Sequence, residues 1–115
     1  MADNLKVFYA PTKVAGTAVV NLLAGASGKT RRCFVRIINI DTVARTCSLA
    51  VSTASTDVTD KGVIPPTLSV AAGDMVTTGD GDGAIVLEST HYLNFQPGTT
   101  NVFVVSVFGV ESDVA

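Results

Sequence analysis

The sequence predicts an all-β protein, a single antiparallel β-sandwich or jelly-roll-like domain over residues 1–115. Nine short runs rich in Val, Ile, Thr and Phe are separated by Gly, Pro, Asp and Ser, which is the composition of strands and of the turns between them. A helix over residues 18–26 is disfavoured by the adjacent Val19 and Val20 and by Gly25. Many closely spaced strands without intervening helices are typical of sandwiches and jelly rolls.

The predicted strands follow one another with turn sequences between them. In order, they are Leu5–Tyr9, Thr17–Leu22, Arg32–Ile40, Thr46–Ser52, Thr67–Val70, Met75–Thr78, Ala84–Leu87, His91–Gln96 and Asn101–Val110. The connections hold the residues that tight turns prefer, with Ala-Ser-Gly-Lys at 26–29, Ala-Gly-Asp at 72–74, a Gly-Asp repeat at 79–83 and Pro-Gly at 97–98. Residues 41–44 predict a hairpin between the third and fourth strands, and residues 1–15 form a candidate N-terminal arm.

The composition indicates a small folded domain with more apolar surface than it can bury alone. Hydrophobic residues make up 47% of the 115 residues and charged residues 16%, which is too apolar for a disordered chain. A domain this small is mostly surface, so we expect copies of the chain or a partner to cover part of it. The apolar runs are far shorter than the roughly 20 residues of a membrane span, and no signal peptide is recognisable. We therefore expect a protein that is made in a cytoplasm and binds no membrane.

Charge is unevenly distributed along the chain. The net charge of −2 argues against a general nucleic-acid binder. Residues 1–52 contain seven Lys and Arg against two Asp, giving +5, whereas residues 53–115 contain one Lys against eight acids, giving −7. Either the two halves interleave and neutralise each other in one sandwich, or a basic face meets an acidic face of a neighbouring subunit.

Two predicted strands are apolar on both faces. Residues 101–110 and 32–40 have large apolar side chains at both odd and even positions, whereas a half-buried antiparallel strand should alternate. Either these strands are central and covered on both faces, or their second face is an interface between subunits. We favour the interface, because the outer face of a two-layer sandwich is normally exposed to water. The candidate interface residues are Phe34, Arg36, Phe103, Val105 and Val107. We expect a homo-oligomer, with a trimer as the first expectation.

The cysteines do not indicate catalysis. On the predicted hairpin, Cys33 and Cys47 lie about five or six residues apart along the ladder, roughly 17–20 Å, too far for a disulfide. We expect both to be free, buried side chains. The single histidine, His91, has no second metal-type ligand at a suitable spacing in the sequence, so we expect it to have a structural role.

Two glycine-containing segments resemble ligand-binding loops without completing the motif. Gly25–Thr30 lacks the first glycine of a phosphate-binding loop, because Leu23 stands there, and it leads into a strand, so it is predicted to be a hairpin turn. Gly79–Gly83 lacks the spacing and the closing glutamate of a calcium loop. We expect no cofactor, no metal site and no catalytic residue.

A basic cluster is predicted around the same hairpin. It consists of Lys29, Arg31, Arg32, Arg36 and Arg45. Alternation places Arg32 and Arg36 on one face and Arg31 on the other, which suits a solvated edge strand or a salt bridge to a neighbouring subunit.

Segments spread over nearly the whole chain resemble a family of small structural proteins of tailed-bacteriophage virions. The matching segments are Lys-Val-Phe-Tyr-Ala-Pro at 6–11, Ala-Ser-Gly-Lys-Thr at 26–30, Arg-Ile-Ile-Asn-Ile-Asp at 36–41, Cys-Ser-Leu-Ala-Val at 47–51, Leu-Ser-Val-Ala-Ala-Gly-Asp at 68–74, Ala-Ile-Val-Leu-Glu at 84–88 and Phe-Gly-Val-Glu at 108–111. The sequence departs from the family at residues 23–25 and 89–91. The resemblance implies a β-sandwich on the phage particle with no catalytic role.

The leading hypothesis is therefore a non-enzymatic virion structural protein, made and assembled in the bacterial host cytoplasm. A capsid decoration (cement) protein on the head surface is its most specific form. The alternative is a neck or tail component, such as an adaptor or fibre-associated module. Its partners would be other copies and the major capsid or the tail and neck proteins. A carbohydrate- or cation-binding sandwich is the outside hypothesis, since the chain has no Trp and only Tyr9 and Tyr92 as tyrosines.

Overall fold

The computed structural model describes residues 5–58, 68–78 and 85–113, and these residues form nine strands and no helix. The strands are β1 (Lys6–Lys13), β2 (Val20–Ala24), β3 (Lys29–Asn39), β4 (Arg45–Ser52), β5 (Leu68–Val70), β6 (Met75–Thr78), β7 (Ile85–Leu87), β8 (Tyr92–Pro97) and β9 (Phe103–Asp113). Each one overlaps a predicted strand. The predicted all-β sandwich is confirmed.

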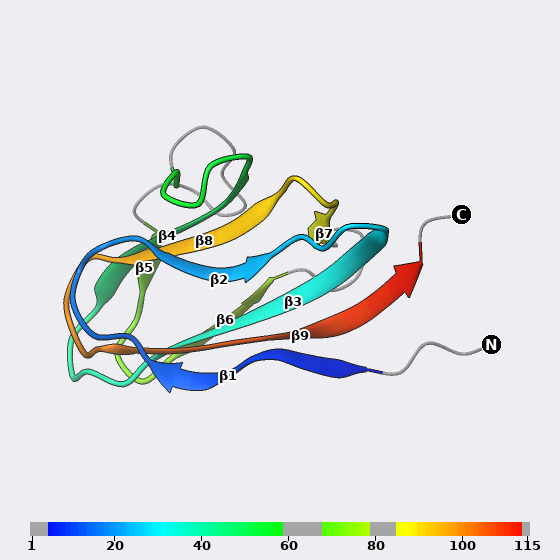
Figure 1. Cartoon of the computed structure of the whole chain (residues 1–115). Helices are drawn as coiled ribbons and strands as arrows, with labels where there is room; N and C mark the ends of the chain where they lie inside the picture. The colour runs from blue at the N-terminus through cyan, green and yellow to red at the C-terminus, as the bar shows by residue number, and fades with distance from the viewer. Residues whose placement is uncertain (1–4, 59–67, 79–84, 114–115) are drawn as a thin grey trace.

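The strands form two antiparallel sheets that pack as two layers (Figure 1). Sheet A has the order β1-β9-β3-β6, with β7 also pairing with β3, and sheet B has the order β2-β8-β4-β5. The pairs are nested, since β1 pairs with β9, β2 with β8, β3 with β6 and β7, and β4 with β5. This nesting is the topology of a jelly roll.

β6 and β7 act as two pieces of one edge strand. β6 pairs with residues 35–38 of β3, and β7 pairs with residues 31–33 of the same strand. β1 forms the opposite edge of sheet A, paired along its length with β9. The described part of the candidate N-terminal arm, residues 5–15, is therefore mostly a strand of the sandwich.

The core lies between the sheets. Side chains alternate across each strand, and the inward positions are apolar. At the centre, Phe95 of sheet B meets Phe103 of sheet A edge to face, with ring centroids 5.8 Å apart. The other fully buried large side chains between the sheets are Ile37, Leu49, Leu87, Leu93, Val35, Val70, Val105 and Val107. Asn39 and Asn94 are fully buried as well, and Asn94 lies on the outer side of sheet B.

The predicted hairpin between the third and fourth strands is wrong. β3 belongs to sheet A and β4 to sheet B, so residues 40–44 form a corner that carries the chain from one sheet to the other. The Asn39 side chain shapes this corner, because its amide donates to the Val43 carbonyl and its oxygen accepts from the Asp41 amide, both at 2.9 Å. Arg45 closes it with a 2.6 Å ion pair to Asp41.

The two cysteines consequently lie on different sheets, where both are buried and free. The prediction of free thiols is confirmed, although the hairpin from which it was argued does not exist. Burial raises the pKa of Cys33 to about 12 and that of Cys47 to about 11. A buried thiol that stays protonated is a poor nucleophile.

The turn at residues 25–30 is also a corner and not a hairpin. It joins β2 of sheet B to β3 of sheet A. The Lys29 amide donates to the Ala26 carbonyl at 3.1 Å, and Gly28 adopts a φ of 74°, a conformation that favours glycine. The segment leads into a strand, as predicted, so it has no helix N-terminus to hold a phosphate.

Candidate interaction surface

The two outward faces of the sandwich differ in chemistry, and the outer face of sheet B is polar. Its outward side chains come mainly from Ser, Thr, Asn and Gln, namely Asn21, Thr46, Ser48, Ser52, Ser69, Asn94 and Gln96. Residues 53–58 cover part of this face. The buried Asn94 amide donates to the carbonyls of Ala54 and Asp57 at 2.9 and 2.8 Å, and the Ser52 hydroxyl donates to Asp57 at 3.0 Å.

The outer face of sheet A is largely apolar, and no segment among residues 5–58, 68–78 and 85–113 covers it. Its apolar side chains are Leu5, Val7, Phe34, Ile38, Met75, Val86, Val104, Phe108 and Val110. Val7 is 69% exposed, Leu5 65%, Met75 49% and Val86 44%. A contiguous apolar patch of this kind on a small domain indicates an interaction site.

An aromatic pair lies at the centre of this face. Phe34 and Phe108 are register partners at the middle of the two longest strands, with ring centroids 5.5 Å apart. The Arg36 guanidinium lies 5.4 Å from the centroid of the Phe108 ring. Two shallow hollows of about 210 and 390 Å³ adjoin these residues, and both are lined by Leu5, Arg36 and Phe108. Aromatic and arginine side chains beside such hollows are typical of the energetic centre of an interface.

The structure corrects the sequence-predicted interface residues. Phe34 and Arg36 lie on the outer face of sheet A, where they can contact a partner. Phe103, Val105 and Val107 are wholly buried between the sheets, so they belong to the core and not to an interface. The reason is that β9 is apolar on both faces, and pairing with β3 turns its odd-numbered positions inward.

Sequence reasoning therefore missed the outward side chains of β9, which are Val104, Phe108 and Val110. One signal could have found them. Ser106 shares their face, and a polar side chain in an apolar strand marks the side that is less deeply buried.

Of the two interpretations of the basic strand, the solvated edge strand is wrong. β3 is central, with β9 on one side and β6 and β7 on the other. Arg32 and Arg36 do share its outer face, while Arg31 points to the other side, as alternation predicted. Arg45 lies on the other sheet. The five basic residues therefore form no single cluster.

Ion pairs within the chain join its basic and acidic halves. Lys6 and Arg31 both contact Glu111, at 3.3 and 2.8 Å, and Lys29 pairs with Asp113. These contacts favour the interpretation that the halves neutralise each other inside one sandwich. In the part of the chain that the structure describes, Arg32 and Arg36 form no ion pair.

Glu111 makes the stability of the fold dependent on pH. Hydrogen bonds from Arg31 and Lys6 hold the pKa of Glu111 below its usual range. A carboxylate with a lowered pKa stabilises the fold above its unfolded pKa of about 4.3, and this contribution is lost as the pH falls through the folded value. We expect urea unfolding to show a smaller acid loss of stability below about pH 4 in Glu111→Gln than in the wild type. Glu88→Gln, at an exposed carboxylate, is the control, and parallel curves for wild type and Glu111→Gln would contradict the assignment.

The sheet edges are poorly suited to pairing with another chain. β1 carries Pro11, begins and ends with lysines, and has two register irregularities against β9. β5 and β7 have three residues each, and β6 has four. β2, the other edge of sheet B, has five residues and a register irregularity against β8. Short strands, proline, lysine and bulges are the devices that protect sheet edges. Association is therefore expected through a face of the sandwich.

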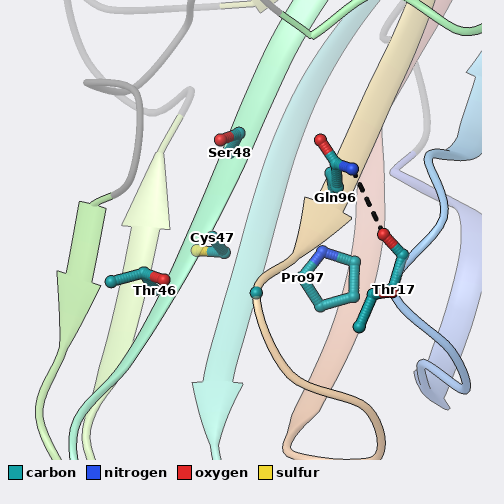
Figure 2. Close-up of a pocket in the computed structure, with 7 residues that line it drawn as sticks. Thr17, Thr46, Cys47, Ser48, Gln96 and Pro97 are labelled. Atoms are coloured by element: carbon teal, nitrogen blue, oxygen red, sulfur yellow. Dashed lines mark hydrogen bonds between the residues drawn. The ribbon is translucent and has the colours of Figure 1, made fainter.

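A pocket of about 270 Å³ on sheet B shows no catalytic arrangement (Figure 2). It is lined mainly by hydroxyl and amide side chains, and Gln96 donates a hydrogen bond of 3.2 Å to the Thr17 carbonyl. Cys47 borders it, but its thiol is buried.

The remaining candidates for chemistry are structural or fall outside the described residues. His91 accepts a hydrogen bond from the Glu88 amide on Nδ1, which supports the predicted structural role. The Gly79–Gly83 segment lies outside the described residues. Within residues 5–58, 68–78 and 85–113, no three His, Cys, Asp or Glu side chains are arranged to hold a metal ion.

No family model and no curated protein matches the chain. Among the residues described, no helix could cross a membrane.

Proposed function

We propose that this chain is a non-enzymatic structural protein of a bacteriophage virion that attaches to the particle through the outer face of sheet A. The uncovered apolar face supports the attachment. The opposite face of the sandwich, on sheet B, is polar and is partly covered by residues 53–58 of the same chain. The edges of both sheets are protected against pairing with another chain. The likeness of the sequence to tailed-phage virion proteins supports the phage particle as the place of attachment, with assembly in the host cytoplasm.

The chemistry of the described side chains supports a protein without catalysis. The two thiols are buried and have raised pKa values, and the histidine ring is tied to a backbone amide. A nucleophile needs an accessible position and a base within hydrogen-bond reach, and neither thiol meets the first condition.

The most specific form of the proposal is a capsid decoration protein on the head surface, with a neck or tail component as the alternative. A broad sheet face suits attachment to a shell. Self-association remains a prediction, with a trimer first. Two observations that suggested self-association do not support it. Phe103, Val105 and Val107 are buried in the core, and the basic and acidic halves form ion pairs within the chain.

A carbohydrate-binding sandwich has less support. Tyr9 and Tyr92 are both half-buried, and Tyr9 packs against the core. Neither tyrosine is fully exposed, and the chain has no Trp to form an aromatic platform for a sugar.

Quantitative mass spectrometry of purified particles of the encoding phage tests the proposal. A decoration protein should occur in a fixed, high ratio to the major capsid protein, and a neck or tail component in only a few copies per particle. Absence of the chain from purified particles would overturn the virion role.

A further inference from the structure

We infer that the outer face of sheet A docks on an apolar surface of another virion protein, and that this surface supplies a carboxylate to Arg36. The inference rests on the proposed function and names the chemistry of its partner.

The face is large enough for a complete interface. Its longest strands, β3 and β9, have eleven residues each, which is a length of roughly 36 Å at strand rise. The four neighbouring strand positions of the sheet give a width of roughly 19 Å. Length times width gives an area of roughly 700 Å², close to the roughly 800 Å² that each partner contributes to a standard interface. The apolar side chains that fill this area, with Phe108 between two hollows, would supply the desolvated centre.

The charge on this face points to an acidic partner. Arg36 lies over the central aromatic pair, Arg32 flanks Phe34 on the same strand, and Lys13 pairs with Val104 at the rim. No acidic side chain lies beside Arg36 on the described strands of this face, and Glu88, directly after β7, lies near Thr30 at its rim. A guanidinium covered by a partner without a carboxylate would be a buried unpaired charge, which is costly. Carboxylates are also the groups that arginine binds most strongly, through paired hydrogen bonds.

The same charges disfavour a second copy packed through this face. Two such faces would bring four guanidinium groups together, with Glu88 as a described carboxylate only at the rim of each face. Like charges across an interface are destabilising. Nucleic acid is also disfavoured. Leu5, Val7, Met75 and Val86 are aliphatic or thioether side chains that offer nothing to phosphates, whereas single-strand binders line a basic groove with stacking rings.

Binding to particles prepared without this chain tests the inference. Purified wild-type protein and its variants are mixed with these particles, and bound protein is measured by co-sedimentation at several salt concentrations. We expect Arg36→Glu and Val7→Asp each to weaken binding by about tenfold or more, as for a residue at the centre of an interface. Arg36→Lys should keep part of the affinity. Ser69→Glu places a new charge on the exposed outer face of sheet B and should bind like the wild type.

Val7 is 69% exposed, so we expect Val7→Asp to fold like the wild type. Thermal unfolding of both proteins checks this, so that a loss of binding can be assigned to the docking face. Wild-type binding that neither Arg36→Glu nor Val7→Asp weakens would overturn the docking face and leave the virion role intact. Wild-type protein that is absent from native particles and does not bind depleted ones would overturn both.

Two further measurements test whether this face binds a second copy of the chain or nucleic acid instead. Sedimentation of the free protein showing an oligomer that Val7→Asp dissociates would assign the face to a second copy and overturn the inference. Fluorescence anisotropy with oligothymidine showing binding that Phe34→Ala abolishes would assign it to nucleic acid and overturn it as well.

Discussion

Replacing Phe103 with alanine is expected to lower the free energy of unfolding by about 3–5 kcal/mol. The ring is wholly buried and packs edge to face on Phe95 of the opposite sheet. Alanine would leave a cavity between the sheets and remove their central aromatic contact. Because small domains are stable by only about 5–15 kcal/mol, this loss would bring the protein close to unfolding at moderate temperature.

Urea unfolding followed by circular dichroism measures this effect, and Phe108→Ala is the matched control. Phe108 lies on the same strand but on the half-exposed outer face, so its truncation should cost clearly less stability. The pair also separates the roles of the two faces, since Phe108→Ala should weaken particle binding. A Phe103→Ala protein with unchanged stability would contradict the core assignment.

Replacing Asn39 with alanine is expected to cost about 3 kcal/mol, since a buried polar group left without its partner costs roughly 1–3 kcal/mol. The Asn39 side chain is fully buried, and its amide donates to the carbonyls of Val43 and Val70, both at 2.9 Å. Its oxygen accepts from the Asp41 amide at 2.9 Å. One side chain thus joins β3, the corner after it and β5 of the other sheet.

Chemical denaturation of Asn39→Ala and Asn21→Ala provides the comparison. Asn21 lies on the edge strand β2 with an exposed side chain that makes longer hydrogen bonds, of 3.1–3.3 Å, so water can replace its partners. We expect Asn21→Ala to cost less than about 1 kcal/mol. Equal losses in the two variants would show that Asn39 does not hold the corner.

The strands could be predicted from the sequence because their signals are local. Val, Ile, Thr and Phe favour extended backbone, and Gly, Pro, Asp and Ser end it, so Met75–Thr78 was predicted with its observed bounds. The outward position of Arg32 and Arg36 was predictable too, since a charged side chain facing the sandwich core would lose its hydration.

The pairing of strands was not predictable from local signals. A connection of a few residues, such as 40–44, can close a hairpin or turn a corner between sheets, and both need the same turn residues. Which one forms depends on partners far along the chain. β3 lies between β9 and the β6–β7 edge, and this position pairs its backbone with strands on both sides and buries Cys33, Val35 and Ile37.

The sequence by itself thus determined the strands, their turns and the presence of more apolar surface than one core can take. The tertiary structure alone decided which apolar face is buried. In β9 both faces are apolar, and alternation with period two defines the two sets without choosing between them. Pairing with β3 turned Phe103, Val105 and Val107 toward sheet B and left Val104, Phe108 and Val110 outside. The outer face of sheet B is partly covered by residues 53–58, so the open apolar surface of the described chain lies on sheet A.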